Sequence, residues 1–191
     1  MLAVFALTGI ALVLVFTYGT LTADVVRYLV FFTGFSAIFS MLQGYRTGRF
    51  QGQASAGKTA VLLLVCILCY ASADTVRSNI AATVEEAARQ GWRFHNIWDV
   101  FNYFHKEGTL VIISQAIALV FTLAVSVLSV LAQVSMRMEA YAVQHADKQN
   151  WRTRLFSVLS KQSSWVTLMF MLVVSTLSLA YAAGWITNLF T

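Results

Sequence analysis

The sequence predicts an all-α, polytopic helical membrane protein with five transmembrane helices. The number falls to four if the first two apolar runs form a re-entrant hairpin or one broken span. Hydrophobic residues make up 59% of the chain and charged residues only 11%, whereas soluble domains spend about a quarter of their residues on charge. The mean hydropathy is +0.71. Charge is absent from five long runs: 1–23, 28–45, 59–73, 109–136 and 162–191.

Each run is taken as one span, because a helix of about 20 apolar residues crosses the hydrocarbon core of a bilayer. The first run has no positive residues before it, so we expect a retained span and not a cleaved signal peptide. Residues 1–191 then form a single transmembrane domain. The expected spans are 2–18, 25–43, 58–75, 109–135 and 165–187.

The segments between the spans predict an orientation. Basic residues dominate 44–58 and 137–161, whereas acids slightly outnumber bases in 74–108. Positive loops stay on the cytoplasmic side of a membrane. We therefore expect a bacterial inner-membrane protein with its N-terminus in the cytoplasm and its C-terminus in the periplasm.

Two amphipathic segments are expected at the membrane surface, one in the outer segment 76–108 and one in the inner basic segment 137–161. The outer one is either interfacial or packed on protein in a periplasmic cap. In the inner one, basic residues beside a tryptophan suit anionic lipid headgroups, and a cytoplasmic protein partner can also dock there. The residues concerned are Phe94, Ile97, Trp98, Phe101 and Phe104 outside, and Trp151, Arg152 and Arg154 inside.

The stretch GQASAGKT, residues 52–59, matches the phosphate-loop pattern of nucleotide-binding proteins. That loop works when a buried strand precedes it and its backbone N–H groups wrap the phosphates. Here the preceding GYRTGRF is too polar for a buried strand, and the following AVLLLVCILCY enters the bilayer. We therefore expect a cytoplasmic turn anchored by Lys58. Cys66 and Cys69, deep in the same span, are expected to be apolar packing residues.

The sequence A-D-x-V-R occurs twice, with Asp24 and Arg27 in the first copy and Asp74 and Arg77 in the second. Acid and base three residues apart can pair on one helix face. The four charges either dock neighbouring helices or subunits, or are satisfied by headgroups and by each other. Because an acid is unfavourable at the C-terminal end of a helix, the helix through Asp74 is expected to continue towards Arg89.

Small residues recur where helices could approach closely. They either pack the spans of one chain or form a seam between subunits, and the sequence leaves both open. The positions are Gly34, Gly44, Ala180 and Gly184, together with the pairs Ser114/Ala118 and Ser178/Ala182.

The sequence shows no recognisable arrangement of catalytic or metal-binding residues. His95, His105 and His145 have no partners at ligand spacing, and no Ser-His-Asp or paired-carboxylate arrangement can be assembled within the spans. We expect no catalytic residues, no metal or cofactor site and no direct nucleic-acid binding.

The segment Tyr28–Val84 has a distinctive layout. A span with Gly34 and Phe35 is followed by the basic turn Gly44-Tyr45-Arg46, a polar loop and a second span that runs into Ser72-Ala73-Asp74-Thr75. This layout resembles the small inner-membrane subunits of I-type conjugation and type IVB (Dot/Icm) secretion systems. The resemblance implies a non-enzymatic component of an envelope-spanning assembly.

The expected function is therefore that of a non-enzymatic subunit of a membrane assembly, present as a homo-oligomer or with other membrane subunits. The alternative is a membrane-embedded sensor or pore-forming effector of a phage-defence or lysis system. A transporter is less favoured, because the chain has no proline and shows no pair of broken helices that could build a substrate site.

Overall fold

The computed structural model describes residues 2–46, 53–91, 109–144 and 158–186, with side chains at 18–43, 45–46, 56–91, 113–139 and 158–186. Its helices are α1 (Leu2–Arg46), α2 (Gln53–Arg89), α4 (Thr109–Gln144) and α6 (Trp165–Ala182), with the short 3-10 helix η1 (Ser160–Ser163) before α6. Within these ranges, four segments are long and apolar enough to cross a membrane. They are Tyr18–Gln43, Ala56–Arg89, Ile113–Glu139 and Trp165–Ala182.

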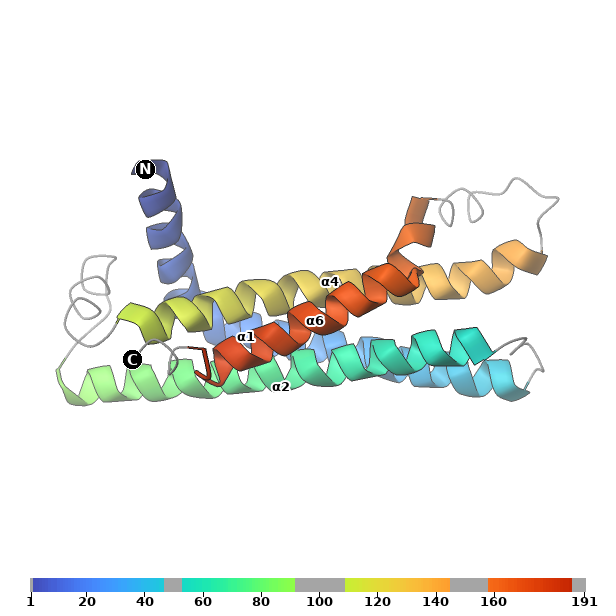
Figure 1. The fold of residues 1–191 in the computed structure, drawn as a ribbon. Coiled ribbons are helices and arrows are strands. Elements are labelled where there is room, and N and C mark those ends of the chain that lie inside the picture. Colours follow the sequence, from blue (N-terminus) through green and yellow to red (C-terminus); the bar gives the residue numbers. More distant parts are fainter. Residues whose placement is uncertain (1, 47–52, 92–108, 145–157, 187–191) are drawn as a thin grey trace.

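The helices form an antiparallel bundle (Figure 1). The helices α2 and α4 contact one another, and α1 and α6 each contact both of them. One end of the bundle, called here the Lys58 end, is where α2 and α6 begin and α1 and α4 end. At the opposite Arg89 end, α2 and α6 end and α4 begins.

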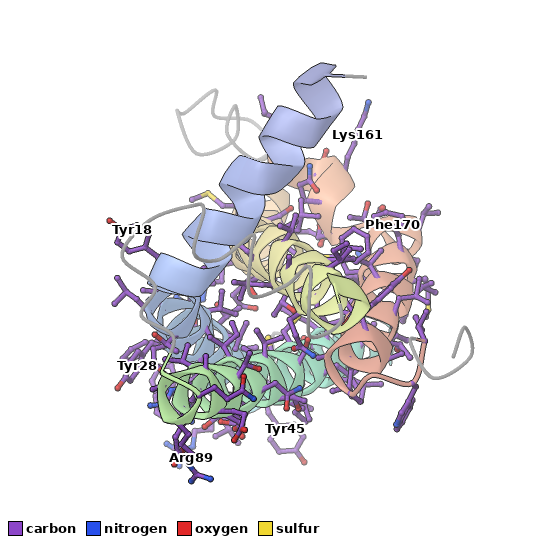
Figure 2. All side chains as sticks on the ribbon, turned by 90° about the vertical axis from the view of Figure 1, so that its left-hand side faces the viewer. Tyr18, Tyr28, Tyr45, Arg89, Lys161 and Phe170 are labelled. Carbon is purple, nitrogen blue, oxygen red and sulfur yellow. The ribbon has the colours of Figure 1, made fainter. Side chains whose placement is uncertain are left out.

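The expectation of separate spans at 2–18 and 25–43 is wrong, because both lie in the continuous helix α1. The expected connection, residues 19–24, is helical and contains no proline, the residue that most strongly breaks a helix. The first part of α1 leaves the bundle at a steep angle in Figure 1 and runs across it in the end-on view of Figure 2. A count of four spans, which the sequence analysis left open, agrees with the four candidate spans of the described residues.

The expected extension of the helix through Asp74 towards Arg89 is confirmed, since α2 ends at Arg89. Its last turns are stabilised by pairs one turn apart, including Arg89 Nη2 with Glu85 Oε1 at 2.7 Å. The helix stops at Gly91, whose φ of 82° suits glycine and whose N–H donates to the carbonyl of Ala88.

The interior contains two apolar clusters, one towards each end of the bundle. The cluster at the Arg89 end consists of Ala23, Val76, Ile80, Ala87, Ala116, Ala118, Leu119 and Ala182. The cluster towards the Lys58 end consists of Val30, Ala37, Leu62, Val65, Cys66, Cys69, Val125, Ala132, Leu168 and Met171. Between the two clusters, each of three helices carries a buried residue with a hydroxyl group: Ser72 on α2, Thr122 on α4 and Ser178 on α6.

Candidate functional site

The two A-D-x-V-R copies lie opposite one another on α1 and α2. The alanine and valine of each copy point into the bundle and are fully buried: Ala23, Val26, Ala73 and Val76. The charged residues of both copies therefore lie at the edge of the α1–α2 contact. The identical spacing on two antiparallel helices gives the pair an approximate two-fold arrangement.

The charges pair across the helices. Arg77 Nε lies 2.9 Å from Asp24 Oδ1, and Arg27 Nη2 lies 3.3 Å from Asp74 Oδ1. Arg27 Nη1 also contacts Asp24 Oδ1 at 3.3 Å, as expected for residues three apart. These contacts join two helices of the same chain, and each of the four charges is also satisfied by another of the four. Docking of a neighbouring subunit through these charges stays a prediction.

Tyr70 completes this group of charges. Arg27 Nη2 donates to the Tyr70 hydroxyl at 2.9 Å, and the Arg27 Cζ lies 5.0 Å from the centroid of the same ring. A cation held at an aromatic ring gains a further electrostatic attraction. We call Asp24, Arg27, Tyr70, Asp74 and Arg77 the ionic clasp. Its formal charge is zero, which suits a position within or beside the hydrocarbon core.

A second polar group closes the middle of the bundle. Ser72 Oγ lies 2.9 Å from both Thr122 Oγ1 and Ser178 Oγ, and the latter two oxygens are 2.6 Å apart. Thr122 and Ser178 also lie 2.7 and 2.8 Å from the carbonyl oxygen of Ala118. The three hydroxyls, called here the hydroxyl layer, are fully buried. Each hydroxyl has one proton to donate. The five short oxygen–oxygen contacts therefore exceed the three protons, and the protons can be arranged in more than one way.

The C-terminus of α6 is held by two amide side chains. The carbonyl oxygen of Ala182 accepts from Asn79 Nδ2 at 2.9 Å and from Gln115 Nε2 at 3.0 Å. Beyond the helix, Gly184 has a φ of 74°, and Trp185 N donates to the Ala180 carbonyl at 3.0 Å. These bonds satisfy carbonyls that a buried helix end would otherwise leave unpaired.

The stretch that matched the phosphate loop is helical from Gln53 onwards, so its backbone N–H groups from residue 57 on are directed along the helix. Lys58 Nζ lies 3.6 Å from Glu139 Oε2 of α4. A Cβ added at Gly57 would lie 3.0 Å from Cη2 of Trp165. The expected cytoplasmic turn is therefore wrong from residue 53 on, because these residues are helical. Gly57 and Lys58 pack the first turns of α2 against α6 and α4.

Gly57→Ala is expected to lower the free energy of unfolding by about 1 kcal/mol, because the methyl group would push against the Trp165 ring. Gly34→Ala is the matched control, since a Cβ there would lie 3.8 Å from Cys66 and Leu63 and alanine favours the helix. Thermal unfolding in detergent would measure both. Equal effects of the two substitutions would contradict the proposed contact.

The two cysteines are free and buried, and Cys66 contributes to the apolar cluster towards the Lys58 end. Their expected role in packing agrees with this position. Gly34 is buried at the contact of α1 with α2. Gly44 lies in the last turns of α1, and Ala180 lies in α6.

The small residues lie in two kinds of position in the structure. Ser114, Ala118, Ser178 and Ala182 are buried inside the bundle, so they pack helices of one chain. Gly184 follows the end of α6 in a turn with positive φ. A larger side chain at Gly184 would strain this turn before it affected any subunit contact. The expected membrane-surface residues lie outside the described ranges: Phe94, Ile97, Trp98, Phe101, Phe104, Trp151, Arg152 and Arg154.

Sequence reasoning missed the hydroxyl layer, the role of Tyr70 and the two amides at the end of α6. One signal was available for the layer, since Ser72, Thr122 and Ser178 are hydroxyl residues well inside apolar runs. Such residues hydrogen-bond between helices in membranes, but their alignment depends on how three helices are rotated and shifted.

These features define the class of the protein: a polytopic helical membrane protein with four candidate spans. Within the described ranges, no group of three or more His, Cys, Asp or Glu side chains is placed to hold a metal ion. No family model, curated protein or solved structure matches the chain.

Proposed function

We propose that the chain is a non-enzymatic subunit of a multiprotein assembly in the bacterial inner membrane, and that it joins the assembly through the outer face of α1. The likeness of Tyr28–Val84 to small subunits of conjugation and type IVB secretion systems supports this class of assembly. The observation that carries the proposal is a stripe of large apolar side chains along α1.

The stripe follows a heptad pattern. Its members are spaced alternately four and three residues apart, and all of them are exposed: Tyr28, Phe32, Phe35, Phe39 and Leu42. Figure 2 shows Tyr28 on the outside of the bundle. The apolar window of α1 is 22% buried inside the bundle, against 28% for that of α6 and 44% for those of α2 and α4. We call these five residues the α1 seam.

Alternate spacing of four and three is the pattern by which two helices pack side chains into each other's gaps. The α1 seam contains no charge. A second copy of the chain presents the same seam, so a two-fold axis along the membrane normal brings the two α1 helices together in parallel. We therefore propose a dimer through the α1 seam as the first contact of the assembly.

The test is disulfide trapping in native membranes. Phe35→Cys and Phe170→Cys are made separately in a Cys66→Ala/Cys69→Ala background. Phe35 lies on the seam and Phe170 on the outer face of α6, with similar exposures of 63% and 60%. We expect Phe35→Cys to give a dimer on oxidation and Phe170→Cys to stay monomeric, because only the first side chain faces its symmetry mate.

Mass measurement in mild detergent provides the second readout. We expect a particle with two 21.2 kDa chains, or a larger one with further subunits. A single chain at every concentration, with no co-purifying protein and no Phe35→Cys dimer, would refute the proposal. Release of a trapped dye from liposomes by the purified protein would instead support the pore-forming alternative.

A further inference from the structure

A groove lies between α1 and α4, and three residues of the α1 seam line it: Phe32, Phe35 and Phe39. Its volume is about 720 Å³, within the range of pockets that bind small molecules. The wall is apolar over most of its length and becomes polar towards the Lys58 end. The lining residues are Leu29, Phe32, Thr33, Phe35, Ser36, Phe39, Val130, Gln133, Val134 and Arg137.

Arg137 is held at the polar end of the groove. Its Nε donates to Ser40 Oγ at 2.8 Å and its Nη2 donates to the Ser36 carbonyl at 3.2 Å. Both acceptors belong to α1, so the guanidinium of α4 bridges the two walls. A guanidinium has five N–H donors in a fork that matches phosphate oxygens. The two bonds to α1 therefore orient the group and leave donors for an anion.

No carboxylate pairs with Arg137 within the part of the chain that the structure describes. Glu139, two residues further on, pairs with Lys58 instead. Arg46 in the last turn of α1 and Lys161 in η1 add positive charge at the same end of the bundle. The Lys58 end is thus basic, and the exposed Arg137 is placed to attract an anion there.

The position of Arg137 matches the depth of a lipid headgroup. It lies two residues before the end of the candidate span Ile113–Glu139, while the apolar wall extends from it towards the middle of the bundle. The hydroxyl of Thr33 in that wall is already used, because it donates to the Leu29 carbonyl at 2.7 Å. An acyl chain suits such a wall, and a phosphate suits its basic end.

We propose that this groove binds one anionic phospholipid, with an acyl chain between α1 and α4 and its phosphate at Arg137. A second copy of the chain is a poorer occupant, because the uncharged α1 seam would bring no anion to the guanidinium. Phe32, Phe35 and Phe39 belong both to this groove and to the α1 seam, so the lipid and the partner helix proposed above contact part of the same surface.

The binding test uses delipidated protein in detergent with phosphatidylglycerol as the probe. Phosphatidylcholine and inorganic phosphate are the comparisons, and native mass spectrometry and thermal unfolding are the readouts. We expect phosphatidylglycerol to remain bound as one molecule per chain and to raise the unfolding temperature. Arg137→Gln keeps a hydrogen-bonding side chain without charge and should weaken this binding about tenfold, or about 1.4 kcal/mol.

Two further variants separate the charge from the groove. Val134→Phe fills the wall and leaves Arg137 in place, so it should also reduce lipid retention, even if Arg137→Gln proves unstable. Arg89→Gln removes an exposed charge at the opposite end and should leave retention unchanged. Equal binding of phosphatidylcholine, full stabilisation by inorganic phosphate, or the same loss in Arg89→Gln as in Val134→Phe would overturn the proposal.

Discussion

Ser178→Leu is expected to lower the free energy of unfolding by about 3 kcal/mol or more, because extra carbon atoms would enter a layer that is fully buried. The same site should tolerate alanine far better. In Ser178→Ala, Ser72 and Thr122 still lie 2.9 Å apart, and Thr122 still reaches the Ala118 carbonyl. The expected loss is about 0.6 kcal/mol, the average for a hydrogen bond between helices in a membrane.

Unfolding in mixed micelles with increasing sodium dodecyl sulfate, followed by circular dichroism, would measure both changes. Thr176→Leu is the matched control, because Thr176 lies on the same helix with its side chain exposed and bonded to the Leu172 carbonyl. We expect that control to differ little from the wild type. A Ser178→Leu protein as stable as the Thr176→Leu protein would show that the three hydroxyls do not meet in a closed layer.

Asp74→Arg is expected to lower the free energy of unfolding by about 2 kcal/mol, because it removes a charge-assisted contact with Arg27 and places like charges together. The expected loss is no larger because the Asp74 side chain is half exposed, and solvent weakens the interaction between exposed charges. A second substitution then distinguishes pairing across the two helices from pairing within each A-D-x-V-R copy. Adding Arg27→Asp should recover part of the loss, since the charges at 27 and 74 are again opposite, whereas residue 27 then faces Asp24 with a like charge.

Adding Arg77→Asp to Asp74→Arg should make the protein less stable still. Because Arg77 pairs with Asp24, the double change places two acids together at one contact and two bases at the other. A pairing within each motif would give the opposite result, with Arg77→Asp as the substitution that restores stability. The same micelle unfolding measurement compares the three variants, and recovery by Arg77→Asp would contradict pairing across the helices.

The prediction from sequence was most successful where it depended on local properties. Apolar length alone located the spans expected at 25–43, 58–75, 109–135 and 165–187, each of which falls largely within one helix of the structure. The separate span expected at 2–18 was wrong, because the absence of charge over the first run does not show where a helix ends. The structure continues α1 through that region, which contains no proline to break the helix.

The sequence by itself determined the class of the protein and the position of four apolar spans, because these follow from hydropathy and charge along the chain. The partners of Asp24, Arg27, Asp74 and Arg77 were decided by tertiary structure, since they depend on the register of α1 against α2. The meeting of Ser72, Thr122 and Ser178 likewise required three helices to be rotated towards one point. Neither register nor rotation is encoded in the spacing within a single helix, because both result from the packing of side chains between helices.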